Sequence, residues 1–430
     1  MEVQKIREIV AQQHDEVLRM NIRSWCDRVE EQFLELNSPL AQIVIGVRRS
    51  GKSTLCHKFL KQNNVNYAYI NFDDERTINF QTEDFDRLLE ALTIVYGDFE
   101  YLFIDEPQNV NYWHLFVNRL LRMQIHVFLT GSNAKLLSGE LATHLTGRYN
   151  QIELYPLSFS EYATLLHIEK TPLLIREKAA LQIAYENYLT KGGLPEVVRL
   201  NRWRNYIANI FNAILERDII QRFHIRYPSV FHDIALYLLS NFTHECNYDR
   251  IAATFGVASD KTVRKYVSYL EQAYLFIPLH KFSYKSRIRT RNAKLYVVDT
   301  AFASAMNELS SNEEGWKLEN IVFLELLRRR REHNYELFYH KNSYEIDFVI
   351  THGKKVVELI QVCSDISNER TLQRELKALT NGSDELNCRT LTLITHSDSR
   401  EVLYKNKNIR IFSAKKWLLG ENVIENKKPL

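Results

Sequence analysis

Apolar residues change their spacing several times along the chain, and each change predicts a different kind of element. Before residue 36 they recur at helical spacing, which predicts one or two amphipathic helices. From residue 41 onward, short and nearly continuous apolar runs alternate with segments of helical periodicity, and the runs cover residues 42–45, 67–72, 101–105 and 125–130. Strands of this kind are buried on both faces. This region is therefore predicted to be a doubly wound α/β domain with a parallel sheet covered by helices.

The pattern changes again after residue 158. Residues 159–242 are predicted to be helical, and residues 248–271 are predicted to form two short helices joined by a turn. From about residue 291, strand-like and helical segments alternate once more, which predicts a smaller α/β domain. The expected division is N-terminal helices over 1–36, an α/β core over 37–158, a helical lid over 159–242, a winged helix over 243–290 and a second α/β domain over 291–430.

Composition narrows the class of protein. Of 430 residues, 45% are hydrophobic and 25% are charged, as in a globular protein with several buried cores. The net charge of +3 is too small to attract nucleic acid through bulk electrostatics, so any basic surface is expected to be local. Five cysteines without a CxxC pair favour a reducing compartment. With no secretory segment and no apolar run of about 20 residues, a cytoplasmic protein without membrane contact is expected.

The first predicted strand leads into a glycine-rich loop with the spacing G-x-x-x-x-G-K-S. Gly46 and Gly51 permit the close backbone approach that a phosphate needs, and the following helix presents its positive end. This order of strand, loop and helix predicts an ATP site in which Lys52 reaches the β- and γ-phosphates and the Ser53 hydroxyl contacts Mg²⁺. The nucleotide-binding residues are predicted to be Gly46, Val47, Arg48, Arg49, Ser50, Gly51, Lys52, Ser53 and Thr54.

Hydrolysis needs further groups at the ends of neighbouring strands. Asp105 ends a buried strand and is predicted to hold Mg²⁺, while Glu106 is predicted to activate the attacking water. Ser132 and Asn133 follow the next strand and are candidates for sensing the γ-phosphate, although the same residues also favour an ordinary turn. Arg148 is a candidate for stabilising transition-state charge, with a solvated surface arginine as the alternative.

A local basic surface is predicted on the second helix of the helix pair. Lys261, Arg264 and Lys265 lie opposite its apolar face and are candidates for contacts with DNA. Winged-helix modules also serve as protein-docking elements, so a protein partner is the alternative. The basic run over residues 328–331 closes another predicted helix, where it is expected to be solvated, with a phosphate contact as the alternative.

Several motifs together resemble a prokaryotic family of AAA-type P-loop ATPases. They occupy residues 46–53, 105–108, 129–133, 147–148, 156–162 and 192–195. The resemblance covers nearly the whole chain, from about residue 23 to about residue 410. It implies ATP hydrolysis, an AAA-type core, a helical and winged-helix middle region, and a C-terminal domain like that of restriction endonucleases. Residues 192–195 also resemble an element of signal-transduction ATPases, which implies a nucleotide-driven switch.

The resemblance also implies where a nuclease site would lie. Endonuclease-like folds use an acidic helix residue, an Asp and a Glu-x-Lys pair to hold Mg²⁺ and steady a hydroxide. Glu319 and Asp347 match the first two positions. Gln361 and Cys363 stand where the Glu and the Lys would be. The loss of one metal ligand and one cationic group predicts a degenerate site.

Three functions are compatible with these features. The first is an ATP-binding and ATP-hydrolysing switch or motor that acts on nucleic acid. The second is an ATP-regulated interaction or signalling module without nucleic acid. The third is an ATP-dependent nuclease. The degenerate C-terminal positions favour the first two, in which the P-loop is the intact catalytic site.

Overall fold

The computed structural model describes residues 1–20, 25–132, 145, 147–283, 293–306 and 314–420. The chain forms two compact units. The first consists of Met1–Tyr155 with Gln272–Tyr274, and the second of Pro156–Glu271 with Leu275–Leu430. The first unit contains the predicted N-terminal segment and the predicted α/β core up to Tyr155. Within the described ranges, no helix is long and apolar enough to cross a membrane.

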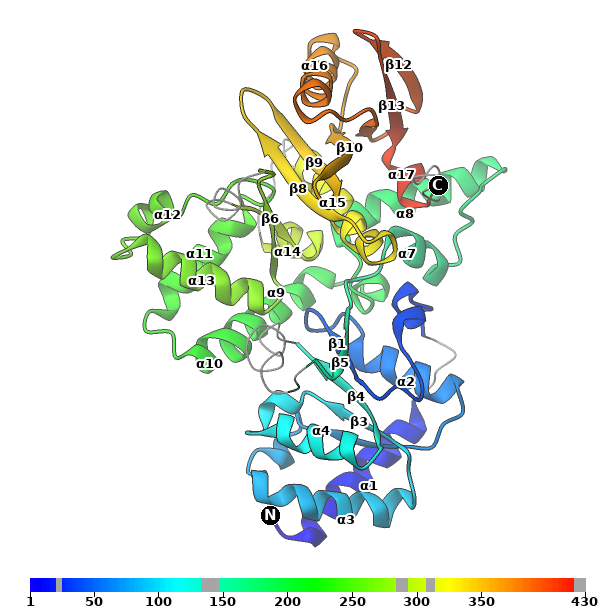
Figure 1. Ribbon diagram of the computed structural model, residues 1–430, viewed down its shortest axis with the longest axis vertical. Helices are drawn as coiled ribbons and strands as arrows, with labels where there is room; N and C mark the ends of the chain where they lie inside the picture. The colour runs from blue at the N-terminus through cyan, green and yellow to red at the C-terminus, as the bar shows by residue number, and fades with distance from the viewer. Residues whose placement is uncertain (21–24, 133–144, 146, 284–292, 307–313, 421–430) are drawn as a thin grey trace. The chain divides into compact units, whose positions relative to one another are not determined.

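The first unit is built on a parallel five-stranded sheet (Figure 1). Its strands are β1 (Ala41–Ile45), β2 (Tyr67–Asn71), β3 (Tyr101–Asp105), β4 (His126–Gly131) and β5 (Tyr149–Glu153), in the order β2-β3-β4-β1-β5. Val44, Thr130 and Asp105 lie at the same level across β1, β4 and β3. The carboxyl ends of these strands therefore meet at one edge of the sheet. The predicted doubly wound α/β fold is confirmed.

Helices connect and cover these strands. α2 (Lys52–Gln62), α3 (Phe85–Tyr96) and α4 (Trp113–Arg122) follow β1, β2 and β3 in turn. The predicted amphipathic helix is α1 (Val3–Arg19), whose apolar face packs against α3 and β2. The short 3-10 helices of this unit are η2 (Val29–Phe33), η3 (Glu75–Thr77), η4 (Thr82–Asp84) and η5 (Pro107–Asn109).

Of the one or two amphipathic helices predicted before residue 36, the described residues contain one, α1. Residues 29–33 form only the single 3-10 turn η2, and the Val29 side chain is 54% exposed. Arg28 has an extended backbone and begins this turn. Polar contacts of Arg28 and Lys58, together with the packing of Phe33 against the core, hold this segment on the sheet domain.

The second unit begins with helices. They are α7 (Phe159–Leu165), α8 (Ile175–Lys191), η6 (Val197–Arg199), α9 (Trp203–Ala213), the π-helix η7 (Ile214–Ile220), α10 (Gln221–Phe223), α11 (Pro228–Leu239), α12 (Tyr248–Thr254) and α13 (Asp260–Gln272). The antiparallel strands β6 (Phe276–His280) and β7 (Ala293–Val297) follow this helix pair. Helices thus occupy the region where the sequence predicted them.

The rest of the second unit is a mixed six-stranded sheet with helices. Its strands are β8 (Glu336–Lys341), β9 (Glu345–His352), β10 (Lys355–Val362), β11 (Leu391–Thr395), β12 (Arg400–Tyr404) and β13 (Lys407–Ser413), in the order β12-β13-β11-β10-β9-β8. The helices are α14 (Thr300–Met306), α15 (Glu314–His333), α16 (Glu369–Leu386) and α17 (Ala414–Leu418). Both α15 and α16 pack against β10. This arrangement agrees with the predicted return to alternating strands and helices.

Candidate active site

The glycine-rich loop lies at the carboxyl end of β1, between that strand and α2. Gly46 has φ of +148°, and a Cβ atom there would lie 2.2 Å from the Leu154 carbonyl oxygen. Gly51 has φ of +96° and begins α2. Both positions therefore require glycine, for close approach in the first case and for backbone angle in the second. The 11 residues of α2 direct the positive end of the helix toward the loop.

Two side chains inside the loop are suited to phosphate. The Lys52 ammonium group is buried and donates to the Val47 carbonyl at 3.1 Å. The positive charge therefore lies within the loop. The Ser50 hydroxyl is also buried and has no hydrogen-bond partner among the described residues. Buried polar atoms normally find a partner. The Lys52 and Ser50 donors fit the phosphate groups of a nucleotide. Thr54, which was also predicted to bind the nucleotide, is exposed at the first turn of α2.

Asp105 lies at the end of β3 and is surrounded by hydroxyl groups. Thr130 donates to one carboxylate oxygen, and Tyr69 donates to the other at 3.4 Å. The Ser53 hydroxyl is a third donor. Burial raises the pKa of Asp105, while the hydrogen bonds from Thr130 and Ser53 oppose the rise. An oxygen-rich pair made of Ser53 and Asp105 fits Mg²⁺, which favours oxygen ligands and retains several waters.

Glu106 follows directly and has a left-handed backbone, with φ of +52°. One of its carboxylate oxygens accepts from the Ser132 backbone N–H at 3.2 Å and from the Ser132 hydroxyl at 3.1 Å. The Gln108 amide donates to the same oxygen. Burial raises the pKa of Glu106, whereas the charge of Lys52 opposes the rise. The carboxylate is thus held in one orientation near the cation of the P-loop.

The structure changes the role expected for the residues after β4. Ser132 contacts Glu106 instead of standing free at the strand tip, so it orients the predicted general base. Asn133 lies outside the described residues. Gln108 was not predicted as a site residue. Its only signal in the sequence was its position two residues after Glu106, in the turn η5.

Arg148 does not join this site. Its carbonyl accepts from Ala41, and the next residue, Tyr149, is level with Ala41 at the start of β1. The P-loop begins at the other end of β1, about 13 Å away at the usual rise per strand residue. Arg148 therefore lies at the opposite edge of the sheet from its own P-loop. Arg48 lies closer, where it pairs with Asp73 at 3.2 Å.

The predicted basic helix is α13. Val263, Tyr266, Val267 and Leu270 are buried on one face, and Tyr269 is buried beside them. Lys261, Arg264 and Lys265 are exposed on the other face. Arg264 also pairs with Asp260 at 3.1 Å and lies over the Tyr248 ring, 4.1 Å from its centroid. These contacts hold Arg264 in place on the surface of the helix pair.

The C-terminal carboxylates converge on a lysine that the sequence analysis did not select. Lys294, in β7, lies 3.0 Å from Glu319, 2.7 Å from Glu345 and 3.5 Å from Asp347. Its side chain is 4% exposed. The Lys294 ammonium therefore supplies the positive charge inside this acidic cluster. Its signal in the sequence was a single lysine within an otherwise apolar strand.

The two substituted positions of the nuclease motif lie in β10 and just after it. The Gln361 side-chain oxygen accepts from the Asp347 backbone N–H at 3.4 Å, so Gln361 borders the acidic cluster. The Cys363 thiol donates to the Asp365 carbonyl at 3.3 Å, and burial raises its pKa to about 11. A neutral thiol cannot replace the cationic lysine of a nuclease site.

Comparisons with known proteins agree with the fold of the first unit. Residues 38–163 match a family model described as an AAA domain, and residues 182–313 match a domain of unknown function. An uncharacterized protein of Methanocaldococcus jannaschii is 35% identical over 371 residues, which are 83% of this chain and 82% of the relative. An uncharacterized protein of Haemophilus influenzae is 33% identical over 343 residues, covering 76% of this chain and 82% of the relative.

Solved structures are similar only in part. The Walker-type ATPase PABY2304 of Pyrococcus abyssi aligns with a TM-score of 0.43 and 15% identity, covering 66% of this chain and 96% of that one. The ORC1 protein of Aeropyrum pernix, solved in complex with DNA, aligns with a TM-score of 0.33 and 12% identity, covering 70% and 92%. Both alignments are too loose to carry a functional conclusion.

Proposed function

This chain belongs to the same family as the Methanocaldococcus jannaschii and Haemophilus influenzae proteins and contains an AAA domain, and we propose that it binds ATP with Mg²⁺ and hydrolyses it. The observation that carries this proposal is the meeting of Lys52, Asp105 and Glu106 at one edge of the parallel sheet. A nucleotide-binding loop, a metal-holding carboxylate and a base are the groups that phosphoryl transfer to water requires.

Each group has a distinct task in the proposed reaction. Lys52 neutralises charge on the β- and γ-phosphates, and the backbone N–H groups at the start of α2 bind the phosphate oxygens. Ser53 and Asp105 would hold Mg²⁺, which when bound neutralises the charge that develops on the phosphate oxygens. Glu106 accepts a proton from the attacking water, and Ser132 and Gln108 keep its carboxylate oriented.

Loss of the P-loop cation tests the proposal. Lys52→Ala is expected to lower ATP turnover by at least about 100-fold, because no other cation of the loop occupies its position. Lys5→Ala removes the same side chain from the exposed surface of α1 and serves as the control, with unchanged turnover expected. Phosphate release at saturating ATP would be measured for both variants. Equal rates in Lys52→Ala and the wild-type protein would refute the assignment.

We further propose that the second unit of this ATPase contacts nucleic acid through α13. The helix pair α12–α13 is followed by the two-stranded sheet β6–β7, and Lys261 and Lys265 are exposed on the second helix. Helix pairs of this kind insert their second helix into the major groove of DNA. In that case the ATP cycle would act as a switch or motor on the polymer.

A salt titration separates this proposal from a protein-interaction module. Binding of a fluorescent DNA duplex is expected to weaken steeply as salt rises, because each phosphate contact releases a counterion. The combined variant Lys261→Ala/Arg264→Ala/Lys265→Ala should weaken binding and lower the salt slope. The control Lys354→Ala/Lys355→Ala/Lys405→Ala removes the same charge from other exposed positions of the second unit. No salt-sensitive binding by the wild-type protein would favour the ATP-regulated interaction module.

A further inference from the structure

A segment that the sequence patterns left without a role lies beside the P-loop. This segment, residues 25–33, is named the strap. Lys58 of α2 donates to Asp27 and to Glu31, at 2.5 Å each. Only 3% of the Lys58 side chain is exposed. The strap is therefore fastened to the same helix that begins at the P-loop.

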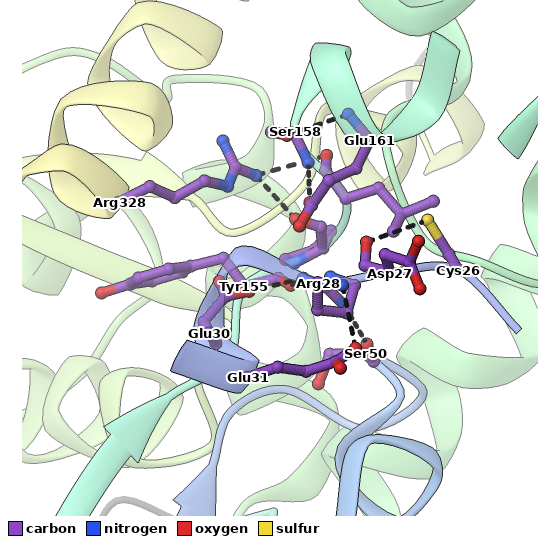
Figure 2. Close-up of polar contacts among 12 residues, drawn as sticks. Cys26, Asp27, Arg28, Glu30, Glu31, Ser50, Tyr155, Ser158, Glu161 and Arg328 are labelled. Carbon is purple, nitrogen blue, oxygen red and sulfur yellow. Dashed lines mark hydrogen bonds and ion pairs between the residues drawn. The ribbon is translucent and has the colours of Figure 1, made fainter. Parts of the chain in front are cut away.

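Arg28 is the residue of the strap that enters the protein interior. Its side chain is 6% exposed, and its guanidinium group donates to two backbone carbonyls (Figure 2). One is the carbonyl of Ser50 in the P-loop, at 3.1 Å, and the other is the carbonyl of Tyr155, at 2.6 Å. A guanidinium presents its donors in a rigid plane, so it fixes two acceptors relative to one another.

The P-loop end of this contact is a peptide with unusual backbone angles on both sides. Arg49 has φ of +67° and Gly51 has φ of +96°. Ser50 lies between them, and its buried hydroxyl has no partner among the described residues. In the proposed ATP site, phosphate oxygens would bind the N–H groups of this loop. Arg28 holds the Ser50 carbonyl, which belongs to a peptide of the same loop. Arg28 therefore contacts the turn of the loop that would lie against the phosphates in the proposed ATP site.

The Tyr155 end of the contact belongs to the last residues of the first unit. The Leu154 N–H donates to the Ile45 carbonyl at 2.7 Å, and the Leu154 carbonyl lies against Gly46. The start of the P-loop therefore touches Leu154, and its end reaches Tyr155 through Arg28. Residues 154 and 155 are fixed to both ends of the loop.

The chain then enters the second unit, where the very next residues are fixed again. Arg328 of α15 donates to the Pro156 carbonyl at 2.7 Å and to the Leu157 carbonyl at 3.3 Å. Leu157 also donates to the Gly193 carbonyl at 2.7 Å. Arg328 was expected to be solvated, but its side chain is only 10% exposed. Arg28 holds the Tyr155 carbonyl and Arg328 holds the Pro156 carbonyl. These two residues are adjacent, so no intervening chain can absorb a shift of one carbonyl.

We propose that Arg28 is a positioning residue that transmits the nucleotide state of the P-loop to the peptide leaving the ATPase unit, an inference that rests on the proposed ATP site. A shift of the Ser50 carbonyl on nucleotide binding moves the guanidinium, and the guanidinium moves the Tyr155 carbonyl. Since residues 156 and 157 are fixed within the second unit, the shift acts on that unit through the covalent chain. Arg28 thereby couples ATP binding to the rest of the molecule.

Hydrogen–deuterium exchange of peptides covering residues 150–162 tests this coupling, in full-length protein with and without Mg²⁺ and adenosine 5′-(γ-thio)triphosphate. In the wild-type protein the nucleotide is expected to change exchange in this segment at least about threefold. Arg28→Gln should lose that change while its nucleotide Kd rises by less than about tenfold, because Lys52 and the loop N–H groups remain. Arg19→Gln, on a side chain that is 78% exposed, is the control and should behave as wild type.

Arg28→Lys covers the case in which Arg28→Gln does not fold. A lysine keeps the charge but lacks the rigid fork, so the nucleotide-dependent change should again be lost. A full nucleotide-dependent change in a folded Arg28 variant would overturn the inference, as would no change in wild-type protein with nucleotide bound. Failure of the wild-type protein to bind the nucleotide at all would instead contradict the proposed ATP site.

Discussion

At the scale of single residues, the proposed hydrolysis depends on how firmly the Glu106 carboxylate is held. Its carboxylate accepts from the Ser132 N–H and hydroxyl and from the Gln108 amide, all on the same oxygen. Among the described residues, these are the donors that the carboxylate contacts, and in the proposed reaction its other oxygen would accept from the attacking water. The sequence identified Glu106 from its place after a buried acidic strand end. It could not identify the contact to Ser132, because that contact depends on strand β4 lying next to β3.

Ser132→Ala removes the hydroxyl donor while leaving the base in place. We expect kcat to fall about tenfold with little change in KM, because the carboxylate is less well oriented but the nucleotide contacts are intact. Gln108→Leu should act in the same direction, since it removes a donor to the same oxygen. Steady-state phosphate release over a range of ATP concentrations measures both parameters. An unchanged kcat in both variants would exclude the orienting role.

At the scale of elements, the loop after α8 is hydrogen-bonded to Asp299, the residue that precedes helix α14. The backbone N–H of Gly193 donates to Asp299 at 2.8 Å, and Asp299 also accepts from Ala301 at 2.8 Å. Burial raises the pKa of Asp299 to about 6, so the carboxylate depends on these donors. A Cβ atom at Gly192 would lie 1.5 Å from an oxygen of Asp299. The Gly192 position therefore has room only for glycine.

Gly192→Ala is predicted to destabilise the protein by about 2–5 kcal/mol, from the strained backbone, with φ of +68° and ψ of −159°, and the clash with Asp299 together. Gly256→Ala is the control, since it also has a positive φ. Its φ of +63° is close to the +68° of Gly192, but nothing lies within 4 Å of the added Cβ. The control should cost about 1–2 kcal/mol from backbone strain alone. Urea unfolding of both variants gives the difference between their losses of unfolding free energy. Equal losses would show that the clash with Asp299 contributes nothing.

The acidic cluster around Lys294 allows a second prediction at this scale. Lys294→Met would leave Glu319, Glu345 and Asp347 without their shared cation. Removal of one partner from a buried ion pair costs about 3–5 kcal/mol, so a large loss of unfolding free energy is expected. Lys341→Met is the control, since that lysine is 44% exposed and pairs with Glu345 at its edge. A loss no larger than that of the control would show that Lys294 is not required.

The elements also show where prediction from the sequence succeeded and where it failed. Apolar runs identified β1 to β4, because strands buried on both faces leave a clear pattern. β5 was missed, since it carries Tyr149, Asn150 and Gln151 and buries only Ile152 fully. β12 was missed for the same reason, with no fully buried residue. Such partly exposed strands are specified by their neighbours in the sheet rather than by their own hydrophobicity.

At the scale of the whole molecule, the two units differ in how far their candidate site residues could be selected from the sequence. In the P-loop unit, the residues of the proposed ATP site could be selected because they lie at strand ends, in an order that can be recognised in the sequence. In the C-terminal cluster, Glu319 and Asp347 were selected from the family resemblance, whereas Lys294 was not. Lys294 belongs to β7, whereas Glu319 lies in α15 and Asp347 in β9, so only the fold brings them together. The P-loop is thus the site whose residues could be selected from their order along the chain.

The central claim is that Glu106 is the base of an ATP-hydrolysing site. The most direct test is single-turnover phosphate release from ATP bound to Glu106→Gln, with the exposed Glu83→Gln as the control. The account predicts that Glu106→Gln binds ATP within about threefold of the wild-type Kd but releases phosphate at least about 100-fold more slowly. Glu83→Gln should match the wild-type protein in both respects. A wild-type rate of release from Glu106→Gln would contradict the account.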